Sequence, residues 1–207
     1  MATIKNIIFD LGGVIINLDM PRTNRAFEAL GIAQFDRIFS QLSQTPLFDD
    51  FDKGLISEQA FFSTIKSQFH LPQPIEALEQ AWNAMLLDFP AHRLEQLLDY
   101  KQRYNTYLLS NTNATHIRAF EKTLADHHSV ANLEPFFNKV YYSCEINLRK
   151  PDKAIFERVL QENGLQAAET VFIDDTLMHV EAARSVGIHA HYLPKGHEFK
   201  TVLDDLL

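Results

Sequence analysis

The side chains that could perform chemistry lie in four short stretches, each next to a run of apolar residues or at the start of an expected helix. They are Asp10, Ser110, Lys150, Asp174 and Asp175. Three carboxylates gathered in one place would repel one another and raise one another's pKa values unless a cation were present. A site rich in oxygen ligands, with few of them from the protein, suits Mg²⁺.

The other side chains of this set suit a phosphate group. Lys150 and the hydroxyl of Ser110, with the backbone N–H groups that follow Ser110, can hold phosphate oxygens. The carboxylate of Asp10 could then take the phosphoryl group and pass it to water. Taken alone, Asp10 could equally be a residue that caps a turn, so the interpretation depends on all four stretches.

These residues can meet only if the apolar runs before them form neighbouring parallel strands. Helical patterns separate the later runs, and this alternation predicts an α/β fold with a doubly wound parallel sheet. The carboxyl ends of parallel strands share one edge, where open sheets bind their ligands. Asp10, Ser110 and the Asp174–Asp175 pair should therefore converge, and Lys150 should arrive from the loop before a helix. The expected strands are residues 4–9, 104–109, 140–142, 170–173 and 189–193.

Residues 18–87 contain no convincing strand and show apolar residues at helical spacing instead. We expect a small helical cap domain inserted after the first strand, with residues 1–17 and 88–207 as the α/β core. The aromatic residues of this insertion are expected to form its own core rather than a ligand site. The repeating residues are Phe61, Ile65 and Phe69, followed by Ile75, Leu78, Trp82 and Met85.

Composition excludes several other classes of protein. The formal net charge of −8 disfavours general binding to nucleic acid or to an anionic membrane, although a local site for a small anion stays possible. One cysteine, Cys144, rules out an internal disulfide framework and fits a reducing compartment. We see no signal peptide, and no apolar run approaches the ~20 residues that span a bilayer. We therefore expect a cytoplasmic protein with a small-molecule partner.

The four stretches, in this order and at these spacings, resemble the motifs of the haloacid dehalogenase (HAD) superfamily, whose members are mostly phosphatases. The matching segments are residues 9–14, 109–111, 149–151 and 171–175. The inserted helical region is similar to the cap of subclass I. The resemblance implies that Asp10 is the nucleophile, that Ser110, Asn111 and Lys150 contact the phosphate, and that Mg²⁺ is the cofactor. It implies as metal ligands Asp10, the backbone carbonyl of Gly12, Asp174 and Asp175.

Two positions depart from the pattern of this family. Most of its phosphatases have a second aspartate, the general acid and base, two residues after the nucleophile, and this chain has Gly12 there. His179 stands where Asn or Asp is common, so the support of Lys150 or of the metal may differ. The branch whose first motif reads Asp-Leu-Gly includes sugar-1-phosphate phosphatases, which residues 54–57 and 110–113 also resemble. We therefore expect a sugar phosphate, such as a sugar 1-phosphate, as substrate.

Two alternatives remain open from the sequence. A 2-haloacid dehalogenase also uses an aspartate nucleophile and lacks the second acid, but the Asp174–Asp175 pair would disfavour an anionic haloacid. A catalytically silent binding protein of the same fold would explain Gly12, yet not the presence of Asp10, Ser110 and Lys150 together.

Overall fold

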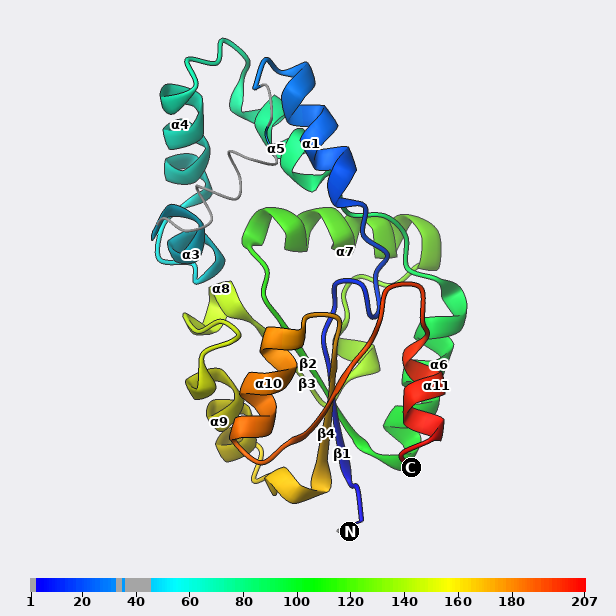
Figure 1. The fold of residues 1–207 in the computed structure, drawn as a ribbon. Coiled ribbons are helices and arrows are strands. Elements are labelled where there is room, and N and C mark those ends of the chain that lie inside the picture. Colours follow the sequence, from blue (N-terminus) through cyan, green and yellow to red (C-terminus); the bar gives the residue numbers. More distant parts are fainter. Residues whose placement is uncertain (1–2, 33–34, 36–45) are drawn as a thin grey trace.

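A five-stranded parallel sheet lies at the centre of the structure, a computed structural model that describes residues 3–32, 35 and 46–207 (Figure 1). The order of the strands across the sheet is β3-β2-β1-β4-β5. The chain therefore builds one half of the sheet outward from β1 and then returns to build the other half, and the predicted doubly wound parallel sheet is confirmed. The strands are β1 (Asn6–Phe9), β2 (Asn105–Ser110), β3 (Lys139–Tyr142), β4 (Thr170–Asp174) and β5 (His189–Tyr192).

Helices cover both faces of this sheet (Figure 1). They are α6 (Ala91–Arg103), α7 (Ala114–His128), α8 (Ser143–Ile146), α9 (Lys153–Glu162), α10 (Leu177–Ser185) and α11 (Phe199–Asp204), with the short 3₁₀ helices η1 (Glu134–Phe136) and η2 (Ala167–Glu169). Side chains of α6, α7 and α11 pack in one apolar cluster with the sheet, and those of α9 and α10 pack in another. None of the helices in the described residues has both the length and the apolar composition that crossing a membrane requires.

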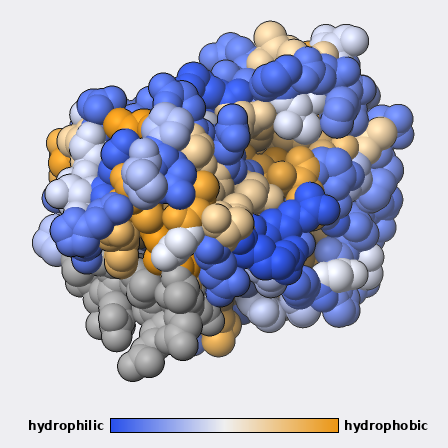
Figure 2. Space-filling model, turned by 90° about the horizontal axis from the view of Figure 1, so that it is seen from above, coloured by the Kyte–Doolittle hydropathy of each residue, from blue (hydrophilic) through white to orange (hydrophobic). Residues whose placement is uncertain are grey.

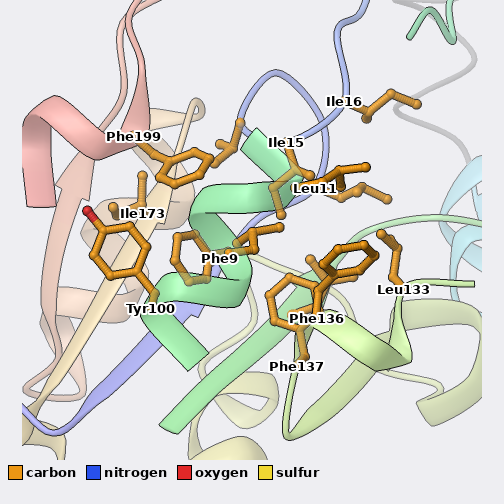
Figure 3. Packing of buried hydrophobic residues seen from close by; sticks show 14 of the residues in the cluster. Phe9, Leu11, Ile15, Ile16, Tyr100, Leu133, Phe136, Phe137, Ile173 and Phe199 are labelled. Carbon is orange, nitrogen blue, oxygen red and sulfur yellow. The ribbon is translucent and has the colours of Figure 1, made fainter. Parts of the chain in front are cut away.

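All four side chains of the central strand β1 are buried. Because successive side chains of a strand point to opposite faces of the sheet, β1 is buried on both faces. Phe9 belongs to the cluster with α6, α7 and α11, and Ile8 to the cluster with α9 and α10. Three aromatic rings surround that of Phe9 at centroid distances of 5.3, 6.1 and 6.3 Å, and they belong to Phe199, Phe137 and Tyr100 (Figure 3). This two-sided packing explains the apolar run in the sequence and fixes the position of the residue that follows it.

The register of the central strands brings predicted site residues side by side. Phe9 pairs with Ile173 of β4, and the N–H of Asp10 donates to the Ile173 carbonyl at 2.9 Å. Asp10 and Asp174 are therefore neighbours at the carboxyl end of the sheet. Ser110 ends β2, on the other side of β1. This edge is the place where the strand order reverses, and sheets of this type bind ligands there.

Among the described residues, four helices form a second unit beyond the carboxyl edge of the sheet (Figure 1). They are α1 (Met20–Ala29), α3 (Pro46–Asp52), α4 (Glu58–Gln68) and α5 (Ile75–Asn83). The unit has an apolar cluster of its own, in which the rings of Phe51 and Phe61 stack with centroids 3.9 Å apart. Phe61, Ile65 and Trp82 are buried in this cluster, as the helical spacing predicted.

The chain crosses between the two units twice, at adjacent places. Leu18 and Leu86 form an isolated antiparallel bridge. The N–H of Asn17 donates to the carbonyl of Asp88 at 3.0 Å, and the N–H of Leu87 donates to the carbonyl of Asn17 at 3.0 Å. The junction is therefore a short two-stranded ribbon.

Candidate active site

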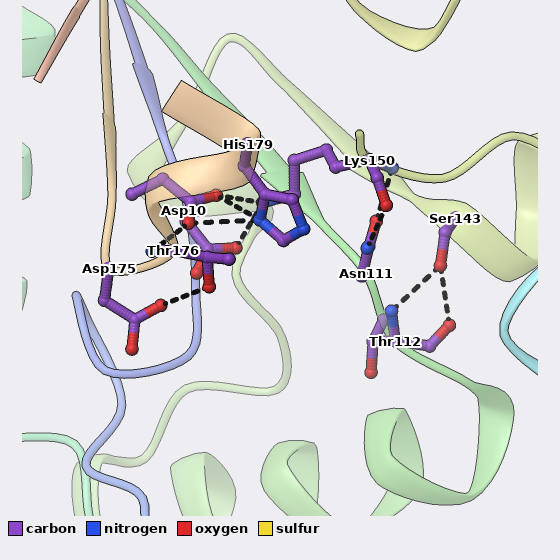
Figure 4. Close-up of polar contacts among 9 residues, drawn as sticks. Asp10, Asn111, Thr112, Ser143, Lys150, Asp175, Thr176 and His179 are labelled. Atoms are coloured by element: carbon purple, nitrogen blue, oxygen red, sulfur yellow. Dashed lines mark hydrogen bonds and ion pairs between the residues drawn. The ribbon is translucent and has the colours of Figure 1, made fainter. Parts of the chain in front are cut away.

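The ammonium group of Lys150 lies between two of the predicted carboxylates (Figure 4). Its Nζ is 2.6 Å from Oδ1 of Asp10 and 2.6 Å from Oδ2 of Asp174. All three residues are buried, with Asp10 the most exposed at 7%. A buried charge is costly unless it is paired, so these three side chains depend on one another.

Burial and charge act in opposite directions on these groups. Burial raises the pKa of Asp10 and the nearby Asp174 adds to this, whereas Lys150 opposes it. Burial also acts on Asp174, but Lys150 and His179 outweigh it and hold the pKa of Asp174 below its ordinary value. Burial alone would lower the pKa of Lys150, yet Asp10 and Asp174 raise it. Lys150 and Asp174 are therefore ionised, and Asp10 is the carboxylate with the least charge compensation.

A third carboxylate completes a group that fits a metal ion. One carboxylate oxygen from each of Asp10, Asp174 and Asp175 lies within 4.8 Å of the other two. Burial and the charge of Asp174 raise the pKa of Asp175, as expected for acidic groups that lack a cation. Carboxylate oxygens at this spacing are ligands of the kind that Mg²⁺ takes. The role of the Gly12 carbonyl as a further ligand stays a prediction.

Gly13 allows Asp175 to come this close. Its φ angle is +71°, a conformation that side chains with a Cβ rarely adopt. A Cβ added to Gly13 would lie 2.3 Å from Oδ2 of Asp175. The glycine therefore serves both the turn after Asp10 and the position of the third carboxylate.

Ser110, the last residue of β2, and Asn111, directly after it, have different roles. Asn111 holds the backbone of Lys150, because its Nδ2 donates to the Lys150 carbonyl at 2.8 Å and its Oδ1 accepts from the Lys150 N–H at 2.8 Å. With both ends of the amide engaged, the side chain of Asn111 positions Lys150, and its predicted contact with phosphate stays a prediction. The hydroxyl of Ser110 has no hydrogen-bond partner in the part of the chain that the structure describes. It is available to a phosphate oxygen.

His179 supports Asp174 (Figure 4). Its Nδ1 lies 3.0 Å from Oδ2 and 3.1 Å from Oδ1 of Asp174. The N–H of Thr176 also donates to Oδ1 of Asp174, at 2.7 Å. The residue that departs from the family pattern thus fixes the orientation of a carboxylate in the cluster.

A cavity of about 300 Å³ lies next to this cluster, between the sheet and the helical unit. Gly12, Ser110 and Asn111 border it on the side of the sheet. From above, the space-filling view shows apolar surface between mostly polar flanks (Figure 2). Much of the cavity wall is apolar and comes from both units: Leu11, Ile16, Leu18, Met20, Phe48, Trp82, Met85, Leu86 and Phe120.

Five polar residues of the cavity wall were not predicted as site residues: Asp52, Thr112, Asn113, His116 and Arg149. The guanidinium of Arg149 lies 3.4 Å from the Asp52 carboxylate. Asn113 caps α7 by accepting from the N–H of His116 at 3.1 Å. Of these five, Arg149, Thr112 and Asn113 had a signal in the sequence, namely their nearness to a motif.

The structure thus combines a doubly wound parallel sheet with a cluster of three carboxylates at the carboxyl edge, where the strand order reverses. Residues 4–187 match the family model of the haloacid dehalogenase-like hydrolases, and the chain belongs to that family. It is 26% identical over 204 residues to a D-ribitol-5-phosphate phosphatase of Bacteroides thetaiotaomicron, a match that covers 99% of this chain and 98% of that protein.

Two solved structures are similar over nearly the whole length. A HAD family enzyme of Bacteroides thetaiotaomicron, in complex with magnesium and inorganic phosphate, is 33% identical with a TM-score of 0.87, covering 96% of this chain and 98% of that one. A predicted HAD-like family hydrolase of Porphyromonas gingivalis is 30% identical with a TM-score of 0.89, covering 99% and 98%. The chain is therefore a HAD-like hydrolase of the phosphatase type, and its carboxylate cluster fits the Mg²⁺ that such enzymes use.

Proposed function

We propose that this enzyme is a Mg²⁺-dependent phosphatase that hydrolyses a small sugar phosphate, preferentially a sugar 1-phosphate, through an aspartyl phosphate formed at Asp10. The observation that carries the proposal is the buried cluster in which Lys150 Nζ lies 2.6 Å from both Asp10 and Asp174. The similarity to a D-ribitol-5-phosphate phosphatase supports a sugar or sugar alcohol phosphate as the substrate class.

Each residue of the site has a role in this proposal. A carboxylate oxygen of Asp10 attacks phosphorus and displaces the sugar oxygen, and water then hydrolyses the resulting aspartyl phosphate to inorganic phosphate and free Asp10. Lys150 and the Ser110 hydroxyl hold the non-bridging oxygens. Bound Mg²⁺ supplies positive charge that offsets the charge of the phosphate and of the carboxylates. Its ligands are Asp10, the carbonyl of Gly12, Asp174 and Asp175. The α/β core, residues 1–17 and 88–207, carries these groups, and the helical cap, residues 18–87, covers them.

The preference for a sugar 1-phosphate follows from position 12. A Cβ added to Gly12 would lie 2.8 Å from Cδ1 of Leu18, so an acidic side chain there would have to displace Leu18. A positioned general acid is worth roughly 10²–10⁴ in rate, most where the leaving group is a poor one. Without it, a phosphate whose leaving oxygen tolerates negative charge should react best. An anomeric oxygen does so better than a primary alkoxide.

The test compares kcat/KM for α-D-glucose 1-phosphate and D-glucose 6-phosphate with Mg²⁺, and includes D-ribitol 5-phosphate as a primary ester. p-Nitrophenyl phosphate, whose leaving group needs no acid, measures the chemistry independently of the sugar. We expect the 1-phosphate to be turned over ahead of the 6-phosphate, and no turnover with excess EDTA. Preference for either primary ester would contradict the 1-phosphate proposal and require an acid from elsewhere in the site. Full activity in EDTA would contradict the metal-dependent phosphatase itself.

A further inference from the structure

His116 connects the two units at the wall of the cavity. It lies in the first turn of α7 and is only 9% exposed. Its ring stacks on that of Trp82 in α5, with centroids 5.5 Å apart and planes 5° from parallel. Its Nδ1 lies 2.8 Å from Oδ1 of Asn83, the last residue of α5. The imidazole is therefore fixed in position by two residues of the helical unit.

These contacts also fix the proton of the imidazole. Burial lowers the pKa of His116 to about 3, so the ring is neutral near neutral pH. Oδ1 of Asn83 can only accept a hydrogen bond, and the single ring proton is therefore on Nδ1. Nε2 is left as an acceptor, and within the described ranges of the chain it has no hydrogen-bond partner.

The surroundings of Nε2 indicate which kind of ligand it could bind. The cavity that His116 lines also borders Gly12 and Ser110, where the phosphate and its leaving group would lie. Asn113 and Asn111 direct their side-chain oxygens to backbone N–H groups of the protein. An acceptor on a largely buried ring in a mostly apolar wall discriminates between ligands, because a molecule that fills the cavity without a matching donor leaves it unpaired.

We propose that His116 is a specificity-determining residue whose Nε2 accepts a hydrogen bond from a hydroxyl group of the bound sugar phosphate. This proposal rests on the proposed function and deepens it, since it adds one hydroxyl donor to the features that the substrate must have. His116 does not replace the missing general acid, because a neutral ring with Nδ1–H bonded to Asn83 has no proton to give from Nε2.

The test compares the wild type with one variant, each on a parent substrate and on derivatives that lack one hydroxyl group. His116→Phe keeps a ring against Trp82 but removes the acceptor. The probes are α-D-glucose 1-phosphate and D-ribitol 5-phosphate, followed by the deoxy derivatives of whichever is turned over faster. In the wild type, one deoxy derivative should lose about tenfold in kcat/KM, the usual scale for one neutral hydrogen bond. In His116→Phe the parent compound should fall to the level of that derivative, so the penalty disappears.

Controls separate recognition from structure. p-Nitrophenyl phosphate has no hydroxyl, so any fall of its kcat/KM in His116→Phe measures effects other than hydroxyl recognition, and the parent sugar phosphate should fall by about tenfold more. His127→Phe makes the same substitution on an exposed position of α7 and should change none of these ratios. His116→Gln, which restores an acceptor oxygen, should recover part of the penalty and serves if the phenylalanine variant does not fold.

The outcomes distinguish this proposal from the proposed function. A deoxy penalty that persists in His116→Phe, or the lack of any penalty in the wild type, would overturn the role of His116 and leave the phosphatase proposal standing. Turnover of p-nitrophenyl phosphate with none of either sugar phosphate would overturn the substrate class, and with it the hydroxyl recognition. No turnover of any phosphate would overturn the phosphatase itself.

Discussion

At the scale of single residues, the site is a balance of buried charges. One ammonium group lies between two carboxylates, and a third carboxylate lies close by. Of the two carboxylates beside Lys150, Asp10 is the one whose pKa is raised, because burial and Asp174 together outweigh the effect of Lys150. A cation bound among the carboxylates would relieve this imbalance. The site is therefore prepared for the partners that its chemistry needs.

Asp10→Asn should abolish turnover and leave the fold intact. The amide has nearly the same size but is a very poor nucleophile, and it removes one charge from the metal site. We expect kcat to fall by about 10⁶-fold, the order seen when the nucleophile is removed from another hydrolase. The measurement is phosphate release by the purified variant, with circular dichroism as the control for folding. A variant that kept a tenth of the wild-type activity would show that Asp10 is not the nucleophile.

His116→Phe should make folding less sensitive to acid. The pKa of His116 is about 3 in the folded protein against 6.5 for the free group. At pH values between these two pKa values, the unfolded chain binds a proton on this histidine that the folded chain does not, so lowering the pH favours unfolding. The slope for one such group is about 1.4 kcal/mol per pH unit. Urea unfolding at several pH values should show a steeper loss for the wild type than for the variant between these two pKa values. Parallel losses would contradict the neutral, buried imidazole.

At the scale of elements, the turn after β1 determines the geometry of the site. The register of β1 and β4 sets Asp10 beside Asp174, and Gly13 admits Asp175. A change in this turn should therefore affect the metal site as well as stability.

Gly13→Ala should weaken both stability and the response to Mg²⁺. A left-handed conformation costs a residue with a Cβ about 1–2 kcal/mol, and the new Cβ would meet Oδ2 of Asp175 at 2.3 Å. Gly164→Ala is the matched control, because Gly164 also has a positive φ, +63°, but has no atom within 4 Å of the added Cβ. Both variants should lose free energy of unfolding, while only Gly13→Ala should need more Mg²⁺ for half-maximal activity. Equal Mg²⁺ dependence of the two variants would sink this account of Gly13.

The central strands β1, β2 and β4 could be predicted from the sequence because each is a short, mostly apolar run that ends at, or just before, a polar residue. Asp10, Ser110 and Asp174 follow from that pattern, since parallel strands bring their ends together. Lys150 was expected instead from the loop before a helix, and it lies between α8 and α9. His116 could not be found in this way. Its role depends on stacking against Trp82, whose position is set by the docking of one unit on the other and leaves no pattern in the sequence. Asp52, which pairs with Arg149 across the same boundary, was not predicted for the same reason.

At the scale of the whole molecule, the cavity exists only because the helical unit is docked on the core. Polar contacts connect the two units across this boundary. Glu58 accepts from Thr115 at 2.8 Å and pairs with Arg118, while the hydroxyl of Ser143 donates to the Asp52 carbonyl at 2.6 Å. Binding of substrate should therefore depend on contacts that never touch it.

Arg118→Met should raise KM with little effect on thermal stability. Arg118 is half exposed, and exposed ion pairs are worth only about 0–1 kcal/mol. Losing its pair with Glu58 weakens docking of α4 on α7, so we expect KM to rise by at most about fivefold and kcat to change less. Steady-state kinetics and a melting curve measure both effects. Lys122→Met, which breaks an exposed pair within α7 alone, is the control and should leave KM unchanged. An equal rise of KM in both variants would contradict a role in docking.

The ribbon that joins the two units has a consequence for how such an enzyme can change over time. Entry and exit of the helical unit lie side by side, tied by the hydrogen bonds between Asn17 and residues 87 and 88. The whole unit is thus a loop closed at its base, inserted where the sheet needs no further strand. A different module with equally close ends could be exchanged at this point as a cassette. The carboxylates and Lys150 would keep their positions, so the reaction would stay the same while the helical side of the cavity changed.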